Sequence, residues 1–231
     1  MNCQLSISKE QVQATFISKV YGWMSCALVV TAAVAMWAVS TPAVIDFIFP
    51  MNTTPIFFYL LIAAEFGAVI YLSARIDKMS AELAGIVFML YAVLNGLTLS
   101  MVFLIYTAGS IASTFLVTAL TFAVMSIYGY TTKKDLTSWG NLLFMALIGL
   151  VIASIVNMFL ASEFMYWIIT YVGVLIFVGL TAYDTQKIKQ MASYDDGQEV
   201  AQKKSILGAL TLYLDFVNLF LYLLRFLGDR K

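Results

Sequence analysis

The chain alternates between long apolar runs and short polar segments. A membrane-spanning helix needs about 20 predominantly apolar residues, because the hydrocarbon layer of a bilayer is about 30 Å thick. Seven of the runs reach that length. The pattern therefore predicts seven membrane-spanning helices, at residues 21–40, 55–74, 81–106, 111–130, 141–161, 164–183 and 206–227.

The runs are expected to form one domain, because the joining segments are mostly short and no internal repeat or soluble domain stands out. We expect a cytoplasmic N-terminal tail at residues 1–20 and a single seven-helix transmembrane domain at residues 21–228. A cleaved signal peptide is the alternative for the first run, but the run and its polar preface are longer than those of a signal peptide. In this run Ala27, Thr31 and Ala35 recur at every fourth position, which favours close helix packing.

Composition supports a membrane protein. Of the 231 residues, 62% are hydrophobic and 11% are charged, whereas a soluble domain carries roughly 25% charged residues. The net charge is zero, so nothing indicates a nucleic-acid-binding surface. The expected surroundings of the chain are those of a lipid bilayer.

The residue types also argue against an enzyme. The chain contains no histidine, the commonest general base and transition-metal ligand. No nucleophile motif is present, and no cofactor is expected. An intramembrane aspartyl protease would use two helical aspartates, but its usual Gly-x-Gly-Asp pattern is absent, since Ala182 and Tyr183 precede Asp184.

Two acidic residues mark the last two runs. Asp184 closes the sixth run and Asp215 lies about ten residues inside the seventh, with a hydrophilic connector, Lys187–Lys204, between them. If the two runs form an antiparallel hairpin, the midpoint between the acids falls inside this connector, so both carboxylates lie at similar depth. An intramembrane carboxylate costs several kcal/mol on most estimates and needs a partner. We therefore interpret Asp184 and Asp215 as a pair.

A polar stripe runs along the last predicted helix. Thr211, Asp215, Asn218 and Tyr222 recur at spacings that place them on one helix face. Such a stripe must face protein or a water-filled path, which suggests that the last helix is the interior one, enclosed by the others. Thr181 lies one turn from Asp184 and extends the polar patch of the sixth helix.

Two further charged residues lie in or beside the second run. Glu65 lies mid-span and should face inward, either as a second ion site or as a structural hydrogen-bonding residue. Arg75 follows Pro55, where the second run begins, at the same spacing at which Asp184 follows Phe164. Arg75 is thus a candidate counter-ion for the acidic pair. The alternative is that it extends to lipid headgroups and marks the inner side.

The positive residues predict the orientation. Ten lysines and arginines lie in the N-terminal tail and in the segments after spans two, four and six, and none in those after spans one, three and five. The N-terminus and the last connector are therefore expected in the cytoplasm. Arg225, Arg230 and Lys231 disagree, because seven spans place them outside. A re-entrant last span would return them inside, and this alternative stays open.

Two neighbouring carboxylates have a specific chemistry. In a low-dielectric site both cannot ionise cheaply, so the pair can share one proton. The resulting hydrogen bond can hold two helices together, and loss of the proton restores repulsion and leaves an oxygen-rich anionic site. Hard cations such as Ca²⁺ favour oxygen ligands. The sequence thus suggests a proton-sensitive cation pathway in which Asp184 and Asp215 contact the ion and Arg75 competes for the pair.

Two segments resemble the signature of the Bax inhibitor (transmembrane Bax inhibitor motif) family. They are Gly179-Leu180-Thr181-Ala182-Tyr183-Asp184-Thr185-Gln186 and Leu212-Tyr213-Leu214-Asp215-Phe216-Val217-Asn218-Leu219-Phe220. The short N-terminal tail is similar to that of the bacterial branch. The resemblance implies a bacterial inner-membrane protein with six helices around a central seventh. It also implies that Asp184 and Asp215 form a pH sensor that controls a calcium leak, and that Arg75 matches an arginine that engages this sensor. The connector looks longer than in compact relatives.

Three functions compete. The first is a pH-sensitive calcium leak channel with Asp184, Asp215 and Arg75 as the gate and Glu65, Asn218, Thr211 and Thr181 along the ion path. The second is an interaction protein that binds a membrane partner and modulates a membrane protease or stress response. The third is a proton-coupled transporter for a small solute, in which the acidic residues relay protons.

Overall fold

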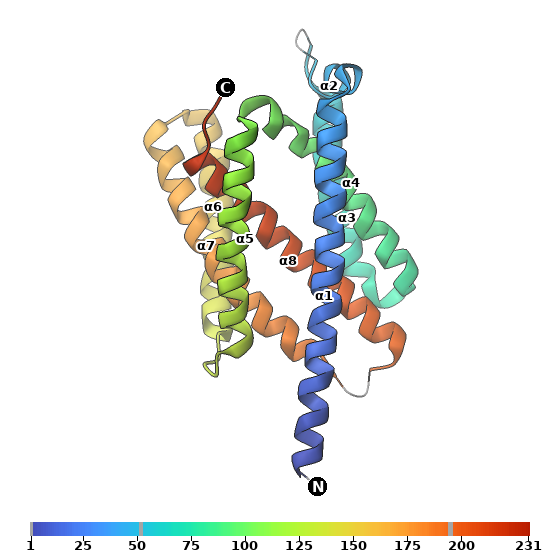
Figure 1. Ribbon diagram of the computed structural model, residues 1–231. Coiled ribbons are helices and arrows are strands. Elements are labelled where there is room, and N and C mark those ends of the chain that lie inside the picture. Colours follow the sequence, from blue (N-terminus) through green and yellow to red (C-terminus); the bar gives the residue numbers. More distant parts are fainter. Residues whose placement is uncertain (1, 51–52, 194–195) are drawn as a thin grey trace. The chain divides into compact units, whose positions relative to one another are not determined.

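Helices account for nearly all of the described chain. The computed structural model describes residues 2–50, 53–193 and 196–231, and only the backbone of residues 2–8. Seven helices in these ranges are long and apolar enough to cross a membrane, which confirms the prediction of an all-α membrane protein with seven spans. The helices in these ranges (Figure 1) are α1 (Asn2–Val39), the short α2 (Pro42–Ile48), α3 (Ile56–Arg75), the single 3₁₀ turn η1 (Ile76–Lys78), α4 (Ala81–Ile105), α5 (Ala108–Thr131), α6 (Thr137–Leu160), α7 (Glu163–Met191) and α8 (Gln198–Leu227).

Side-chain oxygens accept hydrogen bonds from backbone amides at several helix starts, because the first backbone N–H groups of a helix have no partner within it. Ser80 Oγ accepts a hydrogen bond from the Leu83 amide at 3.2 Å at the start of α4. Before α6, Asp135 Oδ1 accepts from the amide and the hydroxyl of Thr137, at 2.9 and 2.6 Å. These two bonds favour the carboxylate and lower the pKa of Asp135.

The structure corrects the predicted connector. Residues 187–204 are mostly helical, because α7 continues to Met191 and α8 begins at Gln198; Asp195, also assigned to the connector, lies outside the described residues. Lysine, glutamine, glutamate and alanine are good helix formers, so polarity did not end either helix. Ile188, inside the predicted connector, is only 2% exposed. Similarly, α1 begins at Asn2, so the predicted N-terminal tail is continuous with the first span.

The chain divides into two compact units. The first contains residues up to Tyr106, residues 191–210 and Lys231, and the second contains residues 107–190 and 211–230. The helix α8 thus begins in the first unit and ends in the second. The single transmembrane domain expected at residues 21–228 stays a prediction.

In the first unit, α1 packs against α4, and α4 also contacts α3. Ala27 and Ala35 are buried, and Thr31 donates a hydrogen bond to the carbonyl of Ala92 at 3.0 Å. A methyl group at Gly96 of α4 would come 2.7 Å from the carbonyl oxygen of Thr31. The small residues of α1 therefore permit the close packing that their spacing predicts.

In the second unit, α5, α6 and α7 lie side by side (Figure 1) and pack with the later part of α8. Glycines make two of these contacts close. A methyl group at Gly129 of α5 would overlap the backbone oxygen of Ala182 in α7, and one at Gly173 of α7 would meet the ring of Tyr222 at 2.6 Å. The core of the unit consists of aliphatic and aromatic residues from α6, α7 and α8: Leu150, Ile169, Ile176, Phe177, Leu180, Leu219 and Leu223.

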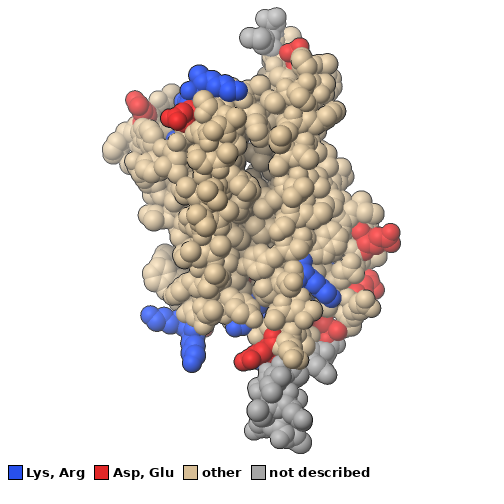
Figure 2. Space-filling view, viewed as in Figure 1, with Lys and Arg blue, Asp and Glu red and all other residues tan. Residues whose placement is uncertain are grey.

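The last span is the most buried of the seven found in the described ranges. In its apolar stretch 61% of the residues are buried, compared with 6% in α6. This agrees with an interior position for α8, while its enclosure by the six other spans stays a prediction. Figure 2 shows charged atoms mainly near helix ends, with other residues covering the middle of the spans.

The end of α8 contradicts a re-entrant last span. The Asp229 carbonyl accepts from the Thr107 amide at 3.1 Å, so the C-terminal segment lies beside the start of α5. At the opposite end of α5, Lys189 of α7 donates to the Tyr130 carbonyl at 2.9 Å. The α7 helix therefore ends on one side of the second unit and α8 ends on the other. The part of α8 in the second unit therefore runs antiparallel to α7.

We expect Gly129→Ala to lower the thermal stability of the purified protein. The added methyl group must push α5 away from α7, and overpacking of this kind costs about 1–3 kcal/mol. The matched control is Gly149→Ala in α6, where nothing lies within 4 Å of the added carbon. Thermal unfolding in detergent should show a lower midpoint for Gly129→Ala alone. Equal midpoints for the two variants would contradict the close α5–α7 contact.

Candidate functional site

The second unit brings together the two predicted sensor residues. Asp184 projects from α7 and Asp215 from α8, and their carboxyl groups lie within hydrogen-bonding reach of each other. Asp215 is only 4% exposed, and Asp184 is half-buried. Neither acid is therefore a freely solvated residue at a helix end or a side chain directed at lipid.

The two acids were paired on the argument that they lie at equal distances from the turn between α7 and α8. The unequal lengths of the two helices show that this argument was wrong. Asp184 lies about two helical turns before the end of α7 at Met191, and Asp215 lies about five helical turns after the start of α8 at Gln198. Along straight helices these spacings correspond to about 10 Å and about 25 Å. The acids are thus not equidistant from the turn. Packing of α7 against α8 within the second unit brings the carboxyl groups together.

Two contacts fix α7 immediately before Asp184. The backbone of Ala182 lies against Gly129 of α5, and the ring of Tyr183 lies against Gly140 of α6 so closely that a methyl group there would overlap it. Side chains larger than hydrogen do not fit at either glycine without a shift of α7. The position of the first carboxyl group therefore depends on glycines of two neighbouring helices.

A side-chain amide fixes α7 immediately after Asp184. The Gln186 carbonyl accepts from the Leu136 amide at 2.9 Å, and its amide group donates to the Lys134 carbonyl at 2.8 Å. These bonds attach α7 to the turn between α5 and α6. Gln186 was not among the predicted site residues. Its position in a motif beside Asp184 was the only signal in the sequence.

One oxygen of the pair needs a donor. Asp215 Oδ2 is buried and has no hydrogen-bond partner in the described part of the chain. A buried polar atom left unpaired costs about 1–3 kcal/mol, and more when it is charged. A proton held between the two carboxyl groups would supply a donor, so the geometry favours a shared proton.

A lysine near the pair was missed by the sequence reasoning, which assigned it to the connector. Lys187 lies three residues after Asp184 on α7, close enough for its charge to act on that carboxyl group. Its ammonium group also lies 5.8 Å from the centre of the Tyr183 ring. The spacing of three residues on a helix was the available signal. Lys187 can stabilise Asp184 when this acid is ionised.

The predicted ion-path residues of the second unit lie on the same two helices as the pair. Thr181 is fully buried, and its hydroxyl donates to the Phe177 carbonyl at 2.7 Å. Asn218 donates to the Leu214 carbonyl at 2.8 Å, and Thr211 is half-buried. These bonds of Thr181 and Asn218 lie within their own helices. Contact of these residues with an ion stays a prediction.

Glu65 lies in the first unit, on α3. Its carboxylate accepts hydrogen bonds from the side chains of Asn95, at 3.2 Å, and Thr98, both on α4. This half-buried group therefore links two helices, as the structural interpretation of Glu65 requires. A role as a second ion site stays a prediction.

Arg75 also belongs to the first unit. It is the last residue of α3, and it is exposed. The acidic pair belongs to the second unit, so contact between Arg75 and the pair stays a prediction.

The donor set limits how a cation could bind. No group of three or more histidine, cysteine or acidic residues suited to a metal occurs in the described ranges. Two carboxylates supply at most four oxygens, whereas Ca²⁺ takes about 6–8 oxygen ligands. Water or backbone carbonyls would have to provide the others. The pair is therefore suited to brief contact with a hydrated cation rather than to tight retention.

The chain matches one protein family and is similar to several bacterial proteins. The model of the family described as "Inhibitor of apoptosis-promoting Bax1" matches residues 13–231. The chain is 55% identical to "Inner membrane protein YbhL" of Escherichia coli strain K12, over 94% of this chain and 92% of that protein. It is 46% identical to an uncharacterized protein of Borreliella burgdorferi, over 95% and 94% of the two chains. An uncharacterized protein of Rickettsia prowazekii is 44% identical over 94% of this chain and 90% of its own length.

The bonds of Glu65 predict a graded effect of substitution. Glu65→Ala leaves the donors on Asn95 and Thr98 without this acceptor, whereas Glu65→Gln retains one acceptor oxygen. Hydrogen bonds between membrane helices contribute about 0.6–2 kcal/mol each. Thermal unfolding should therefore give a lower midpoint for the alanine variant than for the glutamine variant. A lower midpoint for the glutamine variant would contradict a structural link through Glu65.

Proposed function

This chain belongs to the Bax inhibitor family, and on that basis we propose that it is a pH-sensitive leak channel for cations, with Ca²⁺ as the transported ion. Asp184 and Asp215 form the gate. The channel needs no cofactor and catalyses no reaction. The observation that carries the proposal is the close approach of two carboxyl groups, one of them only 4% exposed, on two membrane-spanning helices.

In this proposal a proton decides whether the route is closed. With one proton on the pair, a carboxyl–carboxylate hydrogen bond holds α7 against α8. Once the proton leaves, two negative charges lie close together in a poorly polarisable site and repel each other. The helices separate, and the exposed carboxylate oxygens attract a hydrated cation.

Other residues have supporting roles in the proposal. Arg75 competes with the shared proton as an alternative partner for the ionised pair. Thr181, Thr211 and Asn218 offer oxygen atoms along the path, and Glu65 offers a further acidic group. The charge of Lys187 acts on Asp184 and would favour its ionised form.

We propose that the protein resides in a bacterial inner membrane, with its N-terminus in the cytoplasm. The name of the Escherichia coli relative supports the first part. The distribution of positive residues supports the second, because ten of them lie on one side of the seven spans.

Liposomes test the gate directly. Purified protein in liposomes with a Ca²⁺-sensitive dye inside should pass Ca²⁺ faster as the pH is raised through the range in which the pair loses its shared proton. In Asp184→Asn and Asp215→Asn one partner cannot ionise and no proton is shared between two carboxyl groups, so the dependence on pH should be altered. Asp229→Asn is the matched control, since Asp229 is an exposed acid beyond the end of α8.

Three results would contradict the gate. A wild type without Ca²⁺ flux would remove the channel. A flux that falls as the pH rises would mean that the shared proton opens the route. A pH profile preserved in both asparagine variants of the pair would remove the sensor.

Cysteine labelling tests the orientation. The background should lack Cys3 and Cys26, and single cysteines replace exposed Thr54, before α3, or exposed Lys133, between α5 and α6. In intact cells with a permeable outer envelope, a membrane-impermeant maleimide should label Thr54→Cys but not Lys133→Cys. Disruption of the membrane should expose both. The reverse pattern in intact cells would invert the proposed topology.

A further inference from the structure

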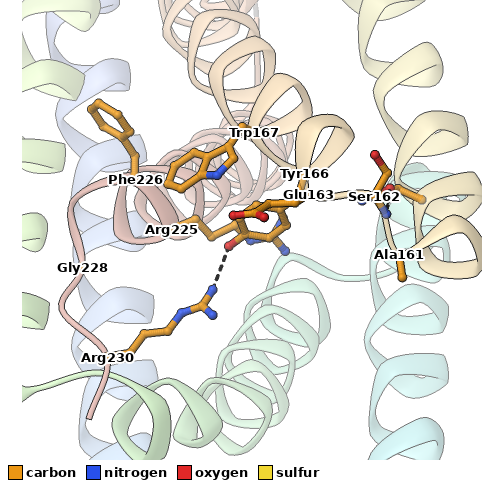
Figure 3. Close-up of a pocket in the computed structure, with 10 residues that line it drawn as sticks. Ala161, Ser162, Glu163, Tyr166, Trp167, Arg225, Phe226, Gly228 and Arg230 are labelled. Atoms are coloured by element: carbon orange, nitrogen blue, oxygen red, sulfur yellow. Dashed lines mark hydrogen bonds between the residues drawn. The ribbon is translucent and has the colours of Figure 1, made fainter.

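The second unit contains a cavity at the end opposite the α5–α6 turn. It is about 570 Å³ in volume and lies where α6 ends, α7 begins and α8 passes into the C-terminal segment. Its polar lining comes from Asn157 and from Ser162, Glu163, Tyr166, Arg225 and Arg230, which are labelled in Figure 3. A cavity of this size can hold a small polar group.

Two guanidinium groups line this cavity. Arg230 Nη2 donates a hydrogen bond to Tyr166 Oη at 3.0 Å (Figure 3). The Arg225 guanidinium lies 5.8 Å from the centre of the Tyr166 ring and 5.3 Å from that of Tyr222. Tyr166 therefore contacts both arginines and keeps them at the same cavity. Cation–π contacts of this kind leave the edge of a guanidinium group available for hydrogen bonds.

The charge of the lining favours an anion. Two arginines face one acidic residue, Glu163. In the described ranges no ion pair is found for Arg225, whose guanidinium contacts aromatic rings. The planar donor set of arginine matches phosphate oxygens in geometry as well as in charge. A phosphate group is the anion that this lining fits best.

The surroundings of the cavity indicate where the phosphate comes from. Phe159 at the end of α6 is 79% exposed, and Phe164 at the start of α7 is 75% exposed. Both helices are membrane spans, so lipid acyl chains cover such apolar surfaces in a bilayer. Tyr166 and Trp167 are of the types that gather at the level of lipid headgroups. Apolar side chains thus lie beside a cationic cavity at one end of the spans.

We propose that this cavity binds the phosphodiester headgroup of a membrane phospholipid. The guanidinium groups of Arg225 and Arg230 hold the phosphate, and the acyl chains lie along the apolar ends of α6 and α7. A lipid bound here contacts three spans at once, because the cavity lining comes from α6, α7 and α8. The cavity lining does not include the acidic pair, and lipid binding is measured without ion flux.

Native mass spectrometry of wild-type protein tests the site without any mutation. Delipidated protein in detergent is mixed with phosphatidylglycerol, phosphatidylethanolamine or diacylglycerol of identical acyl chains. We expect a complex with one retained lipid for both phospholipids, at least about tenfold more abundant than for diacylglycerol, because charge-assisted hydrogen bonds to the phosphate are lost in the latter. Equal retention of diacylglycerol would overturn the proposal.

Substitutions of the two arginines test whether the phospholipid binds in the cavity. Arg225→Gln/Arg230→Gln should reduce phospholipid retention about tenfold, and Arg225→Lys/Arg230→Lys should reduce it less, because charge remains while the planar donor set is lost. Lys231→Gln is the matched control, because it removes a neighbouring positive charge that does not line the cavity. Retention that is unchanged in the double glutamine variant, or equally reduced in Lys231→Gln, would overturn the assignment.

A competition experiment separates a lipid from a soluble anion. Inorganic phosphate or glycerol 3-phosphate is added at millimolar concentration to the wild-type complex. We expect the phospholipid to stay bound, because its acyl chains contribute apolar contacts that neither competitor can make. Complete displacement by either anion would overturn the proposal in favour of a site for free phosphate esters.

Discussion

Burial of two carboxyl groups in one membrane site is the constraint on which the other features depend. A single buried carboxylate is costly, and two adjacent ones cannot both ionise without strong repulsion. Asp215 is buried, and one of its oxygens has no donor in the described part of the chain. The proximity of Asp184 offers a solution, because one proton can satisfy both groups. In the proposed gate, this shared proton makes the contact between α7 and α8 sensitive to proton concentration.

Close packing of neighbouring helices positions α7 for the contact between Asp184 and Asp215. Contacts hold α7 on both sides of Asp184, with Gly129 and Gly140 packed against the residues before it and the hydrogen bonds of Gln186 after it. Backbone-to-backbone approach at Gly129 leaves little freedom for α7 to adjust. In the proposed gate, repulsion between the two ionised carboxyl groups must therefore separate α7 from α8 against these contacts.

The sequence alone predicted the features that follow from the free-energy cost of placing polar or charged groups in the membrane. Seven apolar runs predicted seven spans, and the cost of an intramembrane acid singled out Asp184 and Asp215. Helix ends were predicted less well, since Lys187–Lys204 is polar but rich in helix-forming residues, and hydropathy does not detect a helix that leaves the membrane. The partners of Glu65 and the bonds of Gln186 depend on neighbouring helices, so spacing along the chain could not reveal them.

Continuity of α8 connects the acidic pair with both ends of this helix. Asp215 lies four residues after Thr211, where α8 passes from the first compact unit to the second. Arg225 lies ten residues further on, about 15 Å along the helix axis. Because a helix transmits displacement along its axis, separation of Asp215 from Asp184 must also move the residues of α8 in the first unit, the cavity at Arg225, or both. A phospholipid held at Arg225 would therefore resist the movement that the proposed gate requires, and the composition of the bilayer would act on the same equilibrium as the proton.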